Sequence, residues 1–132
     1  MSKDFEPIRV MPSRAMISRS YTFEAAHFLS DLPVGHKCKR MHGHSYRVEV
    51  RIDGPVDEAG LVRGIEFGMI DTVMEPILIS VDHHTWNDKI QCPTVEHIAS
   101  YLAVIISKAL NVPVTVRAYE GPRSWAEVCY EG

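Results

Sequence analysis

The chain has 132 residues, of which 45% are hydrophobic and 23% charged, a composition typical of one globular domain. This composition excludes a disordered, fibrous or collagen-like chain. Fourteen basic and 17 acidic residues give a net charge of −3, which argues against a nucleic-acid-binding protein. It does not exclude a small anionic substrate that binds at a local basic patch.

The sequence predicts neither a membrane partner nor secretion. Its longest apolar run, Tyr101–Ile106, is far shorter than a membrane span, and residues 1–15 lack the apolar segment of a secretory signal. The three cysteines, at positions 38, 92 and 129, are an odd number, which fits a reducing compartment better than a disulfide framework. We therefore expect a cytoplasmic protein.

The first half of the chain is predicted to be rich in strands. Residues 1–14 are expected to form an extended N-terminal arm, and residues 15–132 a single domain. Alternating apolar residues predict a strand over residues 15–25, followed by a loop to residue 40. Residues 46–52 alternate most clearly and predict a second strand. A third, short strand is expected at Leu61–Ile65.

The second half is predicted to hold both helices. Apolar residues recur at helical spacing from Phe67 to Leu78, and Pro76 is expected to bend or shorten this helix. The second helix is expected to begin after Thr94, a good N-cap, and to end at Asn111. Two closing strands are expected over residues 114–119 and 126–130. The fold class is therefore α+β, with both helices on one face of an antiparallel sheet.

Two histidines at the entry to the second strand are the sharpest feature of the sequence. His42 and His44 are two residues apart, so on a strand they lie on the same face and can bind one metal ion. If the first two strands pair, His27 completes a set of three. Three imidazoles suit Zn²⁺ and leave its fourth position open, as in catalytic zinc sites. The alternative is that the pair is exposed polar surface and that His27 is a hydrogen-bonded histidine at a strand end.

Cys38 lies four residues before His42 and allows three interpretations. It is a fourth zinc ligand, which would make the site closed and structural, or a reactive thiolate, or an ordinary loop cysteine. A thiolate would be favoured by the nearby Lys37, Lys39, Arg40 and the metal.

Two further acidic positions are candidates for chemistry. Asp82 precedes His83, and a carboxylate beside a histidine can orient a proton-transfer group. Adjacent residues on a strand face opposite ways, so this pair requires a loop. Glu120 ends an apolar strand, where a carboxylate can accept two hydrogen bonds from an amidine-like edge. In the alternative interpretation both positions are solvated loop or strand ends.

Taken together, these residues resemble the 6-pyruvoyltetrahydropterin synthase and 6-carboxytetrahydropterin synthase family. The resemblance spans residues 17 to 131, in the order and spacing of that family. Its motifs are Phe23-Glu-Ala-Ala-His27, Gly35-His-Lys-Cys38, Cys38-Lys-Arg-Met-His42-Gly-His44, Val81-Asp-His83 with Asn87-Asp88, Pro93-Thr94-Val-Glu96, and Tyr119-Glu120 with Trp125-Ala-Glu127.

The resemblance implies a tunnelling fold and a set of roles. It makes His27, His42 and His44 the zinc ligands, and Cys38 the catalytic base. Asp82 and His83 complete the acid–base machinery, and Glu120 anchors a pterin ring. It also implies subunits that join into barrels, usually a hexamer formed from two trimers, with active sites at subunit interfaces.

The reaction implied is a zinc-dependent lyase reaction on 7,8-dihydroneopterin triphosphate. The favoured product is 6-carboxy-5,6,7,8-tetrahydropterin, a queuosine precursor, formed with loss of triphosphate and acetaldehyde. The alternatives are 6-pyruvoyltetrahydropterin synthesis for tetrahydrobiopterin and a non-catalytic zinc module closed by Cys38. The chain departs from the family pattern at Glu66, where Asp is common, at Trp86, where Leu is common, and in its longer N-terminal arm.

Overall fold

A computed structural model describes residues 6–132. Nine elements follow in chain order: β1 (Arg14–His27), the 3₁₀ helix η2 (Lys37–Lys39), β2 (His42–Pro55), α1 (Phe67–Val81), β3 (His84–Thr85), the 3₁₀ helix η3 (Trp86–Asp88), α2 (Val95–Leu110), β4 (Val114–Gly121) and β5 (Ser124–Tyr130). Neither α-helix in this part of the chain combines the length and apolarity that crossing a membrane requires.

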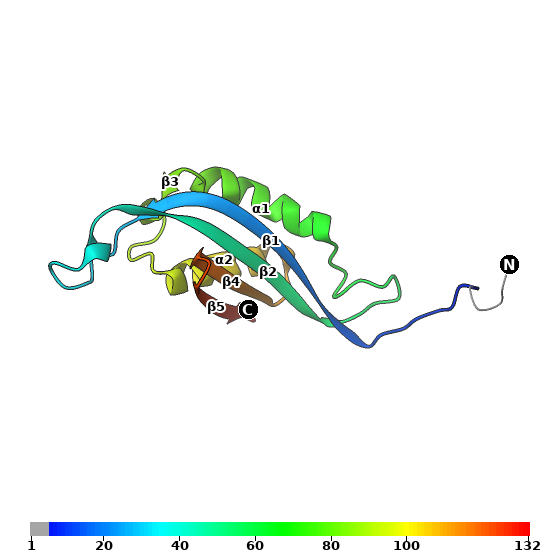
Figure 1. The fold of residues 1–132 in the computed structure, drawn as a ribbon. Coiled ribbons are helices and arrows are strands. Elements are labelled where there is room, and N and C mark those ends of the chain that lie inside the picture. Colours follow the sequence, from blue (N-terminus) through cyan, green and yellow to red (C-terminus); the bar gives the residue numbers. More distant parts are fainter. Residues whose placement is uncertain (1–5) are drawn as a thin grey trace.

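The longest feature of the fold is an antiparallel ribbon of β1 and β2 (Figure 1). Its register runs from Arg14 opposite Pro55 to His27 opposite His42. Side chains alternate between the two faces of a strand. Tyr46, Val48, Val50 and Ile52 of β2 are therefore all buried on one face. This register sets His27, His42 and His44 at the same end of the ribbon, on that same face.

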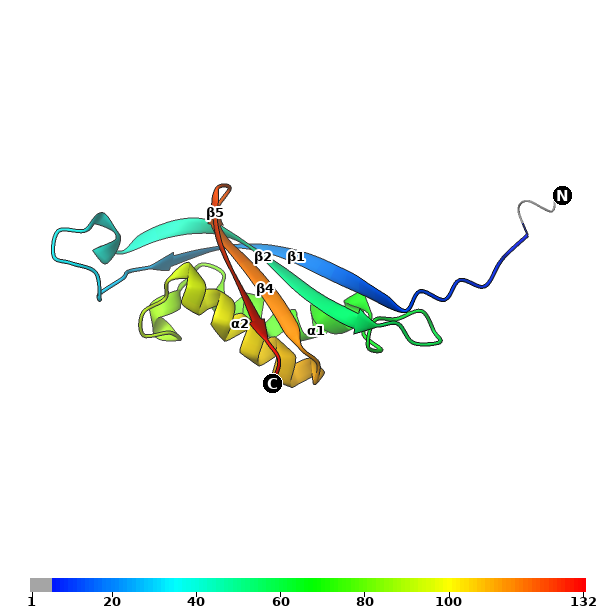
Figure 2. The same ribbon diagram turned by 90° about the horizontal axis from the view of Figure 1, so that it is seen from below.

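The sheet has the order β3-β1-β2-β4-β5, and its buried face packs on both helices. Figure 2 shows α1 and α2 lying together on one side of the strands. Ile70 and Met74 of α1 and Ile98 and Leu102 of α2 are fully buried with the apolar residues of β2 and β4. The expected α+β architecture is confirmed. All strand pairs are antiparallel except β1 with β3, which are parallel.

The second helix is confirmed together with its caps. The Thr94 side-chain oxygen accepts a hydrogen bond from the backbone N–H of His97 at 3.2 Å, as an N-cap does. Asn111 ends α2 in the left-handed conformation, with φ of 58°, which a helix C-terminus favours. The two closing strands also form, each slightly longer than expected.

Three details of the expected elements are wrong. Leu61–Ile65 is not a strand: two isolated bridges, Val56 with Val62 and Val62 with Ile65, close a compact turn instead. Pro76 does not shorten α1, which continues to Val81, because its apolar stripe packs on the core and outweighs a cost of about 3 kcal/mol for a helical proline. Between the two helices, where the sequence predicts no element, the chain forms β3 and η3.

The predicted N-terminal arm covers residues 1–14, of which residues 1–5 lie outside the described part of the chain. Residues 6–13 form no helix or strand, and β1 begins at Arg14. Ile8 and Val10 are 81% and 70% exposed. This segment extends away from the sheet (Figure 1).

Candidate active site

Three histidines converge where β1 ends and β2 begins. One nitrogen of each ring lies within 4.8 Å of one nitrogen of the other two. His27 is the last residue of β1 and is 1% exposed, while His42 and His44 are half-buried. The convergence predicted from the sequence is therefore present. Among the described residues, this is the only group of three or more potential metal ligands.

The hydrogen bonds of two rings define which nitrogen faces the centre. Nδ1 of His27 lies 2.8 Å from the carbonyl oxygen of Pro93, and Nδ1 of His42 lies 2.7 Å from that of Arg40. A carbonyl oxygen can only accept, so each Nδ1 must carry the proton and donate it. In the neutral rings both Nε2 atoms then present lone pairs.

These two Nε2 atoms lie only 2.9 Å apart. Facing lone pairs repel at this separation unless a cation, either a proton or a metal ion, lies between or beside them. Burial, the largest influence, lowers the pKa of His27 and so favours the neutral ring that binds a metal. Carbonyl acceptors on the outer nitrogens are also the usual support of metal-binding histidines.

The donor set fits Zn²⁺. Two nitrogens on one tetrahedral zinc ion, each about 2.0–2.1 Å from it, lie about 3.3 Å apart, so the rings of His27 and His42 need to shift by only a few tenths of an ångström. Three neutral imidazoles leave one coordination position for water or substrate. Cys38 is not a member of the group of converging ligands.

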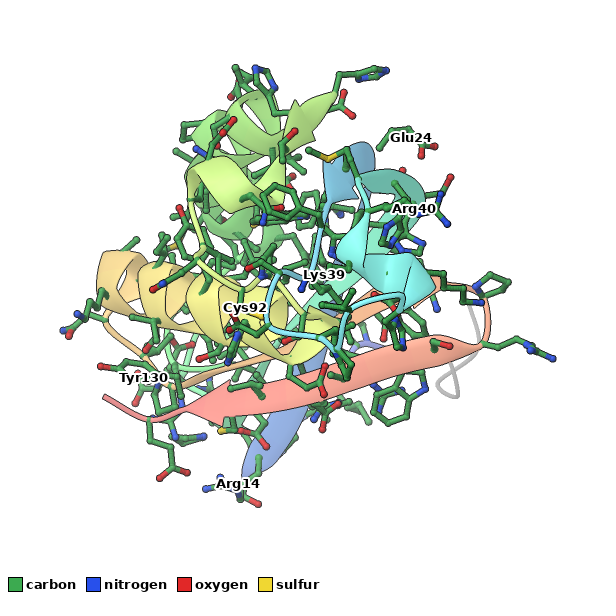
Figure 3. The ribbon with its side chains drawn as sticks, turned by 90° about the vertical axis from the view of Figure 1, so that its left-hand side faces the viewer. Arg14, Glu24, Lys39, Arg40, Cys92 and Tyr130 are labelled. Carbon is green, nitrogen blue, oxygen red and sulfur yellow. The ribbon has the colours of Figure 1, made fainter. Side chains whose placement is uncertain are left out.

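Cys38 lies on the loop between β1 and β2, within the short helix η2. It is half-buried and forms no disulfide. Its backbone holds the loop, because its N–H donates to Nδ1 of His36 at 3.1 Å and its carbonyl accepts from the N–H of Leu29 at 2.9 Å. Figure 3 looks at this end of the molecule and labels Lys39 and Arg40 on the same loop. The loop therefore carries a thiol and several cations, and it leads into His42 at the start of β2.

Asp82 and His83 form a pair, as the sequence suggested they could only in a loop. Asp82 caps the C-terminus of α1, and His83 has a φ of 60°, which turns the chain sharply there. Nδ1 of His83 lies 3.1 Å from Oδ1 of Asp82. The backbone N–H of Glu24, which donates to Asp82 at 2.9 Å, is the main cause that holds the pKa of Asp82 below its ordinary value. Asp82 is thus an anion at neutral pH that can orient His83.

One open cleft joins His44 to the Asp82–His83 pair. It has a volume of about 830 Å³ and is lined by His44, Tyr46, Asp82 and His83, together with residues near the end of β4. A second hollow of about 410 Å³ shares His44 and His83 with it and extends to β3. Such a cleft can take a ligand that touches the histidine cluster and the Asp82–His83 pair at once.

Glu120 is placed by an irregularity in β4. Tyr119 pairs with Trp125 of β5 and Gly121 pairs with Ser124, so Glu120 is an extra residue, a β-bulge, between them. The charge of Glu120 raises the pKa values of both His27 and Tyr46, although burial is the larger influence on each. In the chain it stands between Tyr119 and Gly121, two residues that line the cleft.

Sequence reasoning missed two residues that hold the site together. Glu24 donates its N–H to Asp82, accepts from the N–H of His83 at 2.6 Å, and receives the Ser45 hydroxyl on its carboxylate. Asn87 bonds both the N–H and the carbonyl of Phe28 at 2.9 Å. Both belong to motifs already noted, but their partners are 21 to 59 residues away in the chain, so no local pattern reveals the contacts.

Three histidines beside an Asp–His pair in an open cleft are typical of a metal-dependent enzyme. The family model described as 6-pyruvoyl tetrahydropterin synthase matches residues 16–131. The chain therefore belongs to this family, and it is an enzyme with the tunnelling fold.

Individual relatives agree with this membership. A protein of Archaeoglobus fulgidus, provisionally named a 6-carboxy-5,6,7,8-tetrahydropterin synthase, is 34% identical over 89% of this chain and 98% of its own. The human 6-pyruvoyl tetrahydrobiopterin synthase is 32% identical over 81% of this chain and 86% of its own. The structure of the Caenorhabditis elegans 6-pyruvoyl tetrahydropterin synthase superposes with a TM-score of 0.72 at 25% identity, and covers 95% of this chain and 99% of that one.

Proposed function

We propose that this chain is a zinc-dependent lyase that converts 7,8-dihydroneopterin triphosphate to 6-carboxy-5,6,7,8-tetrahydropterin, with loss of triphosphate and acetaldehyde. The observation that carries the proposal is the pair of Nε2 atoms of His27 and His42, 2.9 Å apart with both outer nitrogens committed to carbonyls. The family match from residue 16 to residue 131 supports the substrate class.

The arrangement suggests a role for each group. Zinc bound by the three histidines would polarise oxygens of the substrate side chain and make the adjoining C–H bonds more acidic. Cys38 moves protons between the side-chain carbons. Asp82 keeps His83 oriented, so that the Nε2 of His83 faces the proton it exchanges. Glu120 accepts two hydrogen bonds from the amidine-like edge of the pterin ring.

The cations of the β1–β2 loop are suited to the leaving triphosphate. Lys37 and Arg40 are exposed and Lys39 is half-exposed, so they can approach an anion without first breaking buried contacts. Electrostatic attraction at such an exposed loop is strongest at low ionic strength. The binding of the triphosphate should therefore weaken as salt is added.

Two product types compete within the family. Several of the relatives that match best carry the 6-carboxy name, among them a Synechocystis protein that is 32% identical over 71% of this chain. The human 6-pyruvoyl enzyme is equally identical, so 6-pyruvoyltetrahydropterin synthesis is the second candidate. For the first candidate, we also propose a place in the queuosine-precursor pathway and a cytoplasmic location.

A non-catalytic zinc module is the third candidate and has less support. It requires Cys38 as a fourth ligand, whereas the group of converging ligands comprises the three histidines alone among the described residues. An open coordination position beside an Asp–His pair is more useful for catalysis than for structure.

We also propose that the domain spans residues 15–132, preceded by the arm, and assembles into a hexamer of two trimers with active sites between subunits. The free edge of β1 supports assembly, because only Ala25 and Ala26 of this strand pair with β3, and an exposed strand edge is a ready place for pairing. Light scattering at micromolar concentration tests this: a mass near six subunits is expected, and a monomer would contradict it.

Product identification tests the reaction. The zinc-loaded protein is incubated with 7,8-dihydroneopterin triphosphate, and the products are separated by mass spectrometry. Carboxytetrahydropterin together with acetaldehyde is expected. A pyruvoyl product without acetaldehyde would move the chain to the second candidate, and no consumption by protein with confirmed zinc would reject both enzymatic candidates for this substrate.

A further inference from the structure

Tyr46 carries a buried hydroxyl that the protein does not satisfy. The residue is 1% exposed, and its hydroxyl oxygen has no hydrogen-bond partner among the described residues 6–132. Leaving a buried polar group unpaired is costly, and phenylalanine would fill the same space without that cost. An unpaired hydroxyl in a candidate active site therefore points to a partner that it gains when a ligand binds.

The position of Tyr46 relates it to both halves of the site. On β2 it follows His44 by two residues on the same face, and its ring centroid lies 5.7 Å from that of His44. Stacking on Phe23, with ring centroids 5.3 Å apart, holds the ring in place. Tyr46 also lines the 830 Å³ cleft.

Glu120 is the neighbour of Tyr46 on the adjacent strand. The ladder of β2 and β4 ends with Arg47 opposite Tyr119, so Tyr46 and Glu120 are the next residues of the two neighbouring strands. Glu120 is half-exposed, and no hydrogen-bond donor to its carboxylate is found among residues 6–132. A buried donor and a half-exposed acceptor therefore occupy neighbouring positions of two adjacent strands.

We infer that the Tyr46 hydroxyl donates a hydrogen bond to the Glu120 carboxylate when a pterin-like ring occupies the cleft. This inference rests on the proposed function. A carboxylate has about four acceptor positions, and the amidine-like edge of a pterin uses two of them. Covering Glu120 with the ring removes its water, so a further donor becomes valuable. The flexible Glu120 side chain can turn toward the fixed tyrosine ring. Tyr46 is thus a positioning residue that acts through Glu120.

Binding of 7,8-dihydroneopterin to zinc-loaded Tyr46→Phe, Glu120→Ala and the double variant tests the inference, with Tyr130→Phe as the control. Tyr130 is a half-buried tyrosine at the opposite end of β5 (Figure 3). Tyr46→Phe should raise the Kd about tenfold, the value of one hydrogen bond to a charged group. It should raise the KM with little change in kcat and leave the zinc content unchanged. Tyr130→Phe should bind as wild type does.

The double variant separates the two ways in which Tyr46 could act. If the hydroxyl acts through Glu120, the double variant should bind no more weakly than Glu120→Ala alone. Losses that multiply would show a direct bond to the ligand and overturn the assignment. If the wild-type protein binds and Tyr46→Phe binds with the same Kd, the inference about Tyr46 is overturned but the proposed function stands. No binding by wild type would overturn both.

A measurement without ligand excludes a merely structural role. If the hydroxyl is unpaired in the free protein, Tyr46→Phe should have a Tm equal to or above that of wild type. A lower Tm would mean that the hydroxyl already has a stabilising partner, and would contradict the inference.

Discussion

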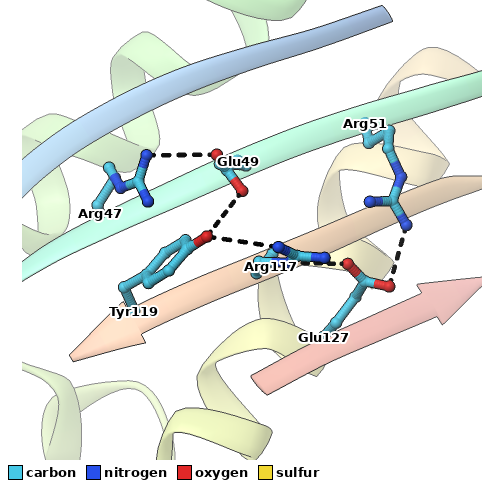
Figure 4. A network of polar contacts seen from close by, with 6 residues as sticks. All are labelled: Arg47, Glu49, Arg51, Arg117, Tyr119 and Glu127. Carbon is cyan, nitrogen blue, oxygen red and sulfur yellow. Dashed lines mark hydrogen bonds and ion pairs between the residues drawn. The ribbon is translucent and has the colours of Figure 1, made fainter. Parts of the chain in front are cut away.

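The polar groups on the two faces of the sheet differ in how completely they are paired. On the face away from the helices, charged residues of β2, β4 and β5 form a continuous network (Figure 4). Glu127 accepts from Arg51 and from Arg117, each at 3.0 Å. Tyr119 donates to Glu49 at 3.3 Å, and Arg47 stacks 4.0 Å above the Tyr119 ring.

On the helix-covered face, at the site end, polar groups are buried and incomplete. The Nε2 atoms of His27 and His42 face each other, and the hydroxyl of Tyr46 and Nε1 of Trp86 have no hydrogen-bond partner within the described part of the chain. Half-exposed ion pairs are each worth less than about 1 kcal/mol, whereas an unpaired buried polar group costs about 1–3 kcal/mol. The difference indicates that the outer network supports the fold and that the inner set is arranged for something that binds.

Among variants that test this difference between the two faces, the largest effect is expected from the removal of one metal ligand. His42→Asn should lower zinc affinity and turnover by more than about 100-fold, since altering even an outer partner of a ligand costs 10- to 100-fold. Zinc content by elemental analysis is the measurement. His97→Asn, which changes an exposed histidine outside the cluster, is the control. Full zinc occupancy in His42→Asn would contradict the three-histidine site.

Removing the thiol should separate binding from chemistry. Cys38→Ala should keep zinc but lower kcat by about 10²–10⁴-fold, the usual worth of a proton-transferring group. Turnover and zinc content are measured on the same preparation, with Cys129→Ala, an exposed cysteine on β5, as the control. Loss of zinc from Cys38→Ala would favour the closed, non-catalytic site instead.

Trp86 tests the packing beneath the site. Its ring is 1% exposed and packs edge-on against Phe23 and Tyr101, with centroids 5.8 Å and 6.0 Å away. Trp86→Leu leaves a cavity and should lower the free energy of unfolding by about 2 kcal/mol, as measured by urea denaturation. Trp125→Leu, at a position 49% exposed on the outer face, should change it much less. Equal losses in the two variants would show that Trp86 does not support the core.

The smallest effect is expected in the outer network. Arg51 first, and Arg117 next, hold the pKa of Glu127 below its ordinary value of 4.5. The stabilisation from this carboxylate is complete above pH 4.5 and is lost as the pH falls through the lowered pKa. Glu127→Gln should therefore cost about 0.5 kcal/mol at pH 7 and nothing at strongly acidic pH. Thermal unfolding at both pH values, beside Glu131→Gln, measures this. A loss that persists at acidic pH would exclude the charge as its cause.

Local signals predicted most of the fold. Alternation revealed the ribbon strands, and Thr94 and Asn111 marked both ends of α2 correctly. The parallel pairing of β3 escaped prediction because it joins Ala25 to His84 across the chain and covers only two residues. Pro76 was expected to bend or shorten the first helix, but α1 continues to Val81, because burial of the helix overrides its intrinsic propensity.

Some features of the candidate site could also be predicted from local sequence, and others could not. Two-residue spacing revealed that His42 and His44 share a face, and a hypothesis of strand pairing added His27. The backbone carbonyls of Pro93 and Arg40, which orient the rings, left no trace in the sequence, since any residue supplies a carbonyl. The bulge at Glu120 also depends on how β5 pairs with β4 rather than on residue type.

The register of the β1–β2 ribbon has a consequence for how the chain folds. A slip of one residue would carry His42 and His44 to the opposite face of the sheet. A slip of two would restore the face but would take His27 out of line with His42, its partner at the last rung. An ion shared by the three histidines would therefore stabilise one alignment of the two strands above all others. Metal binding during folding would then favour the β1–β2 ribbon that has the correct register over ribbons whose register is shifted.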